Sequence, residues 1–326
     1  MAQKKVLVLG ATGETGASIV NALLEAGKFE VSALVRPSSA EKPAVKALRD
    51  RNVDIRVVDI TTDSVEAIAQ KLSDIHTVIS AIAPNAHLAQ LRLVDAAKVA
   101  GVKRFVPCAF ATAAPSGGIM VIRDEKEAVF QHLWKQYIPY TIIDVGYWHQ
   151  LSFPRLPSGR LDYAMVTPSP ATFYGDPDIP TAVTDLRDVG RYVALIIEDD
   201  RTLNQKVFVY GDLITQRGAA ELVEKLSGEK IGPINHVTPE ELLAQIDSLK
   251  ATFDPNDTSL ARKIPLIGAQ YNYSKFVRGD NQPERAAYLG YLDGRKLYPD
   301  FQPISFEAFL KEVVDGKAKK VYEGRF

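Results

Sequence analysis

The sequence predicts an α/β fold in which helices cover both faces of a doubly wound parallel sheet. Apolar runs alternate with helix-like runs through the first half of the chain, and these runs are apolar throughout, as in strands buried on both faces. The predicted strands span residues 6–9, 30–35, 54–59, 76–81, 104–108, 140–145 and 206–210. The predicted helices between them span residues 17–26, 64–72, 85–100, 123–137 and 188–197.

The first strand leads into a glycine-rich turn. Gly10, Gly13 and Gly16 follow the apolar run with the spacing G-x-x-G-x-x-G. Gly10 permits a tight turn, Gly13 lets the backbone approach a diphosphate, and Gly16 lets the helix lie against the sheet. The helix N-terminus offers N–H groups and the positive end of a dipole to phosphate, which predicts a dinucleotide site. A structural turn without a ligand is the alternative. The other turn residues assigned to this site are Thr12, Glu14 and Thr15.

The end of the second strand indicates which dinucleotide is bound. An NAD site usually has Asp or Glu about 20 residues after the glycines, to accept hydrogen bonds from the ribose 2'-hydroxyl. This chain has Arg36 there, with Ser38 close by. A guanidinium and hydroxyl groups suit a 2'-phosphate, so NADPH/NADP+ is the predicted cofactor, although Arg36 could instead be a solvated loop residue. Asp59 and Ala81, which end the third and fourth predicted strands, are assigned to the same site.

Composition excludes several kinds of partner. A net charge of -1, from 39 basic and 40 acidic residues, gives no sign of a surface that would bind nucleic acid or an anionic membrane, so we expect a small-molecule partner.

The single cysteine cannot form an intramolecular disulfide, and no apolar run approaches the roughly 18 residues that span a bilayer. The first strand starts by Lys5, which leaves no room for a signal peptide, so we expect a cytoplasmic protein. The histidines lack zinc-site spacing, so no metal is predicted, and the oligomeric state stays open.

The alternating pattern ends near Gly146. Residues 149–180 are rich in proline and aromatic side chains, which indicates ordered loops and short strands that form a pocket wall. Ligands of open α/β sheets bind at the carboxyl ends of the strands, where we expect a smaller lobe to lie. The predicted division is residues 1–150 for the NADP(H)-binding domain, with 181–210 returning to it, and residues 151–180 and 211–326 for the substrate-binding lobe, with helices near 219–226 and 240–249.

The helix predicted after the fifth strand carries a lysine within its apolar stripe. Ile122, Val129, Phe130 and Leu133 form the stripe, and Lys126 occupies the i+4 position. A lysine that points inward must snorkel out, pair with an acid, or have its pKa lowered by desolvation. In the last case it is a usable general acid/base near neutral pH, so Lys126 is a candidate for both catalysis and cofactor contact. A snorkelling lysine is the alternative.

With these features the chain resembles the isoflavone reductase-like and NmrA-like group of atypical short-chain dehydrogenases, whose plant members reduce isoflavones, pinoresinol and phenylcoumaran benzylic ethers. The resemblance implies a Rossmann fold that binds NADP(H). It also implies a catalytic general base at the lysine fourteen residues before the tyrosine of I-P-Y-T, and counting back from Tyr140 gives Lys126. The segments that carry the resemblance, besides the glycine turn and the lysine helix, are Arg36, F-V-P at Phe105–Pro107, I-P-Y-T at Ile138–Thr141 and D-L-R-D-V-G at Asp185–Gly190.

Ordinary short-chain dehydrogenases carry Y-x-x-x-K on this helix, but Ile122 occupies the tyrosine position here and leaves the lysine alone, as in the reductases. A Y-x-x-x-K does occur at Tyr271–Lys275. It falls in the predicted lobe, and we interpret it as chance. We interpret Cys108, at the end of the fifth strand, as a packing thiol rather than a nucleophile.

Four further residues are candidates for substrate binding. His149 follows the sixth strand and could be a second proton donor, or could hydrogen-bond within its loop. Phe110, Trp148 and Phe153 suit an aromatic wall against a planar substrate, although aromatic side chains also serve as core. The predicted function is an NADPH-dependent reductase of an aromatic or conjugated small molecule: a carbonyl, an enone, a quinone methide or a benzylic ether. A non-enzymatic NmrA-like redox sensor that binds NADP(H) is the alternative, and since such sensors generally lack the lysine, Lys126 favours the enzyme.

Overall fold

The computed structural model describes residues 3–254 and 259–323, and the chain divides into two compact units. Each unit is assembled from three segments that are separate in the sequence. Unit 1 consists of Met1–Phe110, Asp124–Ile143 and Val189–Val207, and unit 2 of Ala111–Arg123, Asp144–Asp188 and Phe208–Phe326.

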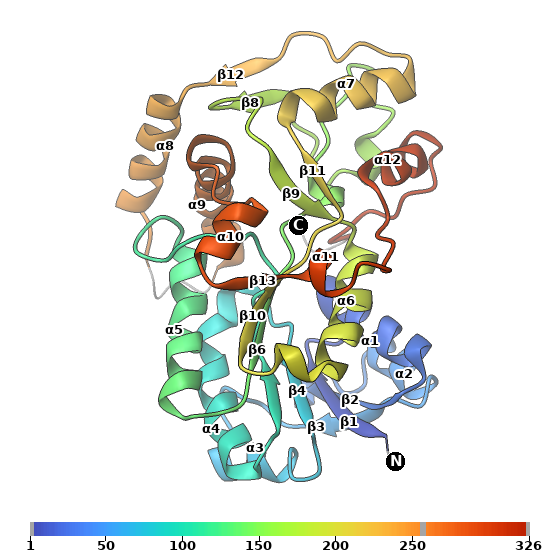
Figure 1. The fold of residues 1–326 in the computed structure, drawn as a ribbon, viewed down its shortest axis with the longest axis vertical. Helices are drawn as coiled ribbons and strands as arrows, with labels where there is room; N and C mark the ends of the chain where they lie inside the picture. The colour runs from blue at the N-terminus through green and yellow to red at the C-terminus, as the bar shows by residue number, and fades with distance from the viewer. Residues whose placement is uncertain (1–2, 255–258, 324–326) are drawn as a thin grey trace. The chain divides into compact units, whose positions relative to one another are not determined.

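Unit 1 is built on a parallel sheet with the order β3-β2-β1-β4-β5. Figure 1 labels β1, β2, β3 and β4 of this sheet. Phe105 forms a parallel bridge with Tyr140, which brings β6 beside β5, and β10 lies next to β6. The order reverses at β1, whose neighbours are β2 and β4, and this is where open α/β sheets bind ligands. The predicted doubly wound fold is confirmed. The strands are β1 (Lys4–Leu9), β2 (Phe29–Val35), β3 (Asp54–Val57), β4 (Thr77–Ser80), β5 (Arg104–Val106), β6 (Thr141–Asp144) and β10 (Gln205–Phe208).

Helices cover both faces of this sheet because its strands are apolar on both sides. Leu7 and Leu9 of β1 join a core with α3, α4 and α5, whereas Val6 and Val8 are fully buried on the opposite face. On that face α6 packs closely on α1, where a Cβ at Gly190 would lie 2.1 Å from the carbonyl oxygen of Ser18. The helices of unit 1 are α1 (Glu14–Ala26), α2 (Pro43–Arg49), α3 (Val65–Gln70), α4 (Gln90–Ala100), most of α5 (Val121–Lys135) and most of α6 (Leu186–Glu198).

Unit 2 combines small sheets with helices. One sheet has the order β11-β9-β7, and β8 pairs in parallel with β12. The apolar residues of the proline-rich segment, such as Leu156 and Leu161, pack against α7 and α12. The strands are β7 (Tyr147–Trp148), β8 (Thr172–Tyr174), β9 (Thr181–Thr184), β11 (Asp212–Ile214), β12 (Asn235–Val237) and β13 (Tyr291–Asp293). The helices are α7 (Gln216–Ser227), α8 (Pro239–Ala251), α9 (Leu260–Tyr273), α10 (Pro283–Tyr288), α11 (Gly294–Leu297) and α12 (Phe306–Val314).

Helix α9 continues directly into a π-helical turn, Ser274–Arg278. Residues 111–123 pack against α9, where the side chain of Gln270 accepts a hydrogen bond from the Val121 N–H at 3.0 Å. The residues that the sequence placed with the first domain but that fall in unit 2 are 111–123, 144–150, 181–188 and 208–210. The reason is physical: their partners lie far along the chain, so periodicity does not reveal them.

Candidate active site

The glycine turn joins β1 to α1, as predicted, and close backbone contacts explain two of its glycines. Gly10 has a φ of +80°, and a Cβ there would lie 2.3 Å from the carbonyl oxygen of Ala81. Gly16 is pressed against the turn itself, since its Cβ would lie 2.0 Å from the carbonyl oxygen of Gly10. Gly13 caps α1, and its N–H donates to the Gly10 carbonyl at 2.9 Å. The turn thus holds the start of α1 at the carboxyl ends of β1 and β4.

The N-terminus of α1 fits a phosphate group. No side chain caps the helix at Gly13, and the N–H groups of a first helical turn have no acceptor within the helix. The helix dipole adds partial positive charge at the same place. Thr12 is exposed, and Glu14 and Thr15 are half-buried, so these assigned residues border the accessible end of the helix.

Arg36 follows β2 directly, at the same edge of the sheet, and precedes the 3-10 turn Pro37–Ser39. Arg36 and Ser38 are exposed, and in the described part of the chain the Arg36 guanidinium makes no hydrogen bond or ion pair. Asp59, just beyond β3, accepts hydrogen bonds from the hydroxyl and N–H of Thr61 at 2.6 and 2.9 Å. These bonds, helped by the charge of Arg36, hold the pKa of Asp59 below its ordinary value. An accessible guanidinium that has no hydrogen bond or ion pair with the described residues fits a phosphate monoester.

Lys126 is buried on the inward face of α5, with 4% of the residue exposed, as the apolar stripe predicted. Its Nζ donates to the carbonyl oxygens of Cys108 and Ala109, both at 2.7 Å. These carbonyls follow β5, so the ammonium lies at the carboxyl end of the sheet. The lysine therefore does not snorkel to solvent.

Residues that sequence reasoning missed surround this ammonium. His87, in the 3-10 turn after β4, has its Nε2 3.5 Å from the Lys126 Nζ and its Nδ1 3.4 Å from a carboxylate oxygen of Glu125. Gln90 donates to the His87 carbonyl at 3.0 Å and accepts from the N–H of Cys108 at 2.9 Å. His87 and Gln90 come close to Cys108 and Lys126 because β4 and β5 are neighbours in the sheet. A local sequence pattern does not show which strands are neighbours.

Phe110, four residues after the end of β5, has a strained backbone conformation. Its φ is +41°, it is 7% exposed, and its N–H donates to the carbonyl of Ile143 at 2.8 Å. A positive φ is rare for a bulky side chain, and strain of this kind is concentrated at functional sites. The assignment of Phe110 to the substrate site stays a prediction.

The other predicted substrate residues, Trp148, His149 and Phe153, belong to unit 2. Trp148 stacks on Tyr322 with ring centroids 5.8 Å apart. Phe153 lines a cavity of unit 2 and packs against Phe309, with the ring centroids 6.0 Å apart.

His149 is fully enclosed. Its ring packs against Phe306 and Phe309, with centroids 5.3 and 5.8 Å away, and burial lowers its pKa to about 4. A neutral imidazole without exposed surface suits packing within unit 2, so these contacts do not add support for the predicted proton donor.

None of the helices in the described residues is both long enough and apolar enough to cross a membrane. The same residues contain no group of three or more His, Cys, Asp or Glu side chains arranged to hold a metal ion.

Known proteins resemble this chain along nearly its whole length. The family model described as the NmrA-like family matches residues 2–310. The chain is 39% identical over 315 residues to the asnovolin J 5',6'-dehydrogenase of Aspergillus novofumigatus, covering 95% of each. It is 27% identical over 330 residues to the bifunctional pinoresinol-lariciresinol reductase 1 of Thuja plicata, covering 96% of this chain and 99% of that one.

Solved structures show the same fold. The binary complex of leucoanthocyanidin reductase with NADPH from Vitis vinifera superposes with a TM-score of 0.79 at 24% identity, covering 95% of this chain and 99% of that one. The match of the family model, together with the dehydrogenase and reductase relatives, confirms the family that the motifs indicated. The chain therefore belongs to the NmrA-like family, among its oxidoreductases of the isoflavone reductase type.

Proposed function

We propose that this oxidoreductase is an NADPH-dependent reductase of an aromatic or conjugated small molecule that carries a carbonyl, enone, quinone methide or benzylic ether. The observation that carries the proposal is the Lys126 ammonium, held at the carboxyl end of a sheet whose glycine turn fits a dinucleotide. The names of the relatives support it, because they include a dehydrogenase of asnovolin J and a pinoresinol-lariciresinol reductase. The proposal includes a cytoplasmic location, which the single cysteine favours.

The cofactor is held by unit 1 and supplies a hydride when bound. The start of α1 at Gly13 receives the diphosphate, and Arg36, with Ser38 beside it, pairs with the 2'-phosphate. Asp59 and Ala81 border the same edge of the sheet. The lack of an acid directly after β2 removes the repulsion that would exclude the 2'-phosphate.

Lys126 manages the proton in this proposal. An ammonium has three N–H groups, and the carbonyls of Cys108 and Ala109 accept from it, which fixes its position. The ammonium gives a proton to the oxyanion or enolate that develops on the substrate, or as the amine it takes one from a phenol. His87, between Lys126 and Glu125, is placed to return a proton to Nζ.

The same contacts would also fit a purely structural role, in which Lys126 ties down the turn at residues 108 and 109. The two roles differ in their consequences. A structural tie would lower stability and cofactor affinity together with turnover. A proton-transfer role lowers turnover and leaves NADPH affinity nearly unchanged.

The experiment is a survey of turnover by the full-length protein. NADPH oxidation is followed by absorbance with quinones, enones and phenolic benzylic ethers. NADP+ reduction is followed with the corresponding reduced compounds, because the relatives include both reductases and a dehydrogenase. We expect turnover with at least one compound and a clear preference for NADPH over NADH. Tight NADPH binding with no turnover in either direction would contradict the proposal. That result would favour the alternative function, a non-enzymatic redox sensor that binds NADP(H).

A further inference from the structure

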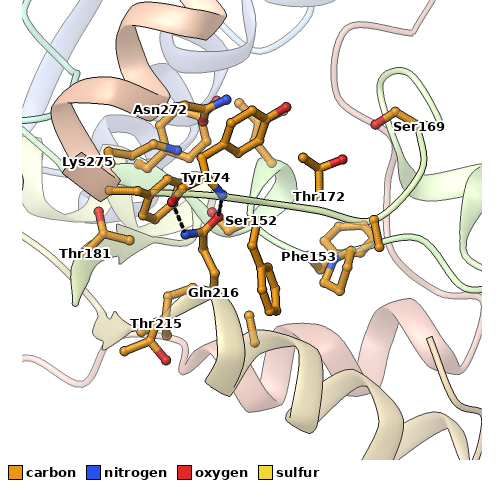
Figure 2. Close-up of a pocket in the computed structure, with 18 of the residues that line it drawn as sticks. Ser152, Phe153, Ser169, Thr172, Tyr174, Thr181, Thr215, Gln216, Asn272 and Lys275 are labelled. Carbon is orange, nitrogen blue, oxygen red and sulfur yellow. Dashed lines mark hydrogen bonds between the residues drawn. The ribbon is translucent and has the colours of Figure 1, made fainter. Parts of the chain in front are cut away.

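Unit 2 contains a cavity of about 290 Å³, which the cofactor and proton steps proposed above do not use. Its walls come from segments that are far apart in the sequence, and Figure 2 shows their side chains turned toward a shared space. Exposed Ser169 and Pro170 lie at its rim. The aromatic side chains that line it are Tyr147, Phe153, Phe173, Tyr174 and Phe276.

Lys275 lines this cavity from the π-helical turn that follows α9. The residue is 4% exposed, and its Nζ lies over the face of the Tyr147 ring, 3.5 Å from the centroid, and 4.6 Å from the centroid of Phe276. Within the described residues its side chain has no hydrogen bond or ion pair. Ring faces attract a cation but do not neutralise it, and a buried cation without an anion is costly. The cavity therefore lacks a negative charge that would balance Lys275.

No carboxylate is found among the described residues that line the cavity. Arg155, the other cation there, is already paired with Asp162, to which its Nε and Nη2 donate at 2.9 and 2.8 Å. Asp280, just beyond the π-helical turn, accepts from Arg278 at 2.9 Å. Because these two acids already have partners, neither balances the charge of Lys275, and a ligand carboxylate can do so.

We propose that this cavity is a binding site for an aromatic carboxylic acid. The ligand carboxylate pairs with the Lys275 ammonium, and its ring packs against Tyr147 and the other aromatic walls. Asn272, one turn before Lys275, lines the cavity beside it, so its amide can donate to the second carboxylate oxygen (Figure 2). The cavity volume is at the small end of the range for small-molecule sites, which suits one or two fused rings. The cavity includes Phe153, which the sequence assigned to substrate binding, so the inference names a ligand class for the proposed substrate lobe and rests on that part of the proposed function. Its test measures binding and does not depend on turnover.

The charge of Lys275 should make binding depend on pH. Burial lowers the pKa of Lys275 to about 7. Tyr147 of β7 and Tyr174 of β8 face the cavity with it, and Tyr271 packs against Tyr147. Burial raises the pKa of all three, to about 12 for Tyr147, so they stay neutral near pH 7. Arg155 stays charged and paired. A bound carboxylate favours the ammonium, so binding takes up a proton above pH 7, and affinity falls by up to about tenfold per pH unit.

The test is isothermal titration calorimetry of the full-length protein with 2-naphthoate, and with 2-naphthamide as a neutral ligand of the same shape. We expect naphthoate to bind at least about tenfold more tightly than naphthamide at pH 6.5, and Lys275→Met to weaken naphthoate by about 10- to 100-fold. Lys263→Met is the matched control, because Lys263 is another buried lysine, in α9, and lies outside the cavity. Its naphthoate affinity should equal that of the parent.

A second readout shows whether the weaker binding of a Lys275 variant comes from the lost ion pair or from general damage to the cavity. At pH 8 the parent should take up a proton on binding, seen as a binding enthalpy that changes with the ionisation enthalpy of the buffer. Lys275→Arg keeps the charge at every pH, so it should bind naphthoate without this uptake and serves if the Met variant does not fold. Equal affinity for the acid and the amide, an unchanged Lys275→Met, or no naphthoate binding at millimolar concentration would each overturn the proposal.

Discussion

Unit 2 should lose stability as the pH falls from 7 toward 4, because His149 is buried in its neutral form. Its pKa is about 4 in the folded protein, against an ordinary value of 6.5, owing to burial among aromatic rings. Between these values the unfolded chain binds a proton that the folded chain does not. Stability is therefore complete above pH 6.5 and declines as the pH falls toward 4. The gap between the two pKa values corresponds to about 3 kcal/mol.

Asp185, whose carboxylate lies 4.0 Å from the His149 ring, does not titrate in the same window. Burial raises the pKa of Asp185, but hydrogen bonds from Arg187 outweigh this, and the net pKa is lowered from 3.8. Its stabilising contribution is present above pH 3.8 and is lost only below it. Asp185 therefore contributes little to the change between pH 7 and pH 4.5, and the comparison with a variant that lacks the imidazole isolates the contribution of His149.

The assay is urea unfolding followed by the fluorescence of Trp148, which adjoins His149 in unit 2. The chain has two tryptophans, so a Trp134→Phe background leaves Trp148 as the only reporter and avoids averaging over both units. The parent should lose about 2 to 3 kcal/mol more than His149→Gln between pH 7.5 and 4.5, because glutamine does not titrate. Parallel pH profiles for the two proteins would refute the reasoning, whatever their absolute stabilities.

Three further substitutions test the cofactor and proton sites. Arg36→Ala should weaken NADPH by about tenfold or more and leave NADH nearly unchanged, because only NADPH carries the 2'-phosphate. Equal losses by calorimetry would show that Arg36 does not contact it. Gly16→Ala should lower the melting temperature of unit 1 and abolish the NADPH-induced thermal shift, since its Cβ would lie 2.0 Å from the carbonyl oxygen of Gly10. An unchanged melting curve with NADPH would contradict this packing. His87→Phe should lower turnover by at least about tenfold at unchanged NADPH affinity, and parental turnover would exclude a role for His87 in proton return.

The sequence predicts the parallel sheet well, because its strands are apolar throughout and its longer helices have a clear period. It does not predict α2 or α9. Helix α2 has only 7 residues, and α9 contains Pro265, which locally signals the end of a helix. Both helices form because tertiary packing outweighs these local signals.

The place of a site residue can be predicted from the sequence only where its own helix or strand determines which way the side chain points. The inward face of Lys126 follows from the stripe on its own helix, whereas His87 approaches it through the pairing of β4 with β5. His149 follows a strand end and looks accessible in the sequence, but Phe306 and Phe309, far along the chain, enclose it. The Tyr271–Lys275 spacing does not indicate a cavity in the sequence, because the walls around Lys275 come from segments that are far apart along the chain.

The most direct test of the central claim is the turnover number of Lys126→Met, measured with NADPH on whichever substrate the survey identifies. Methionine retains the apolar stem but removes the ammonium that donates to the carbonyls of Cys108 and Ala109. If Lys126 transfers the proton, turnover should fall by about 100- to 10,000-fold, while the NADPH dissociation constant and the circular dichroism spectrum remain close to those of the parent. Turnover within tenfold of the parent in a folded, NADPH-binding variant would contradict the account.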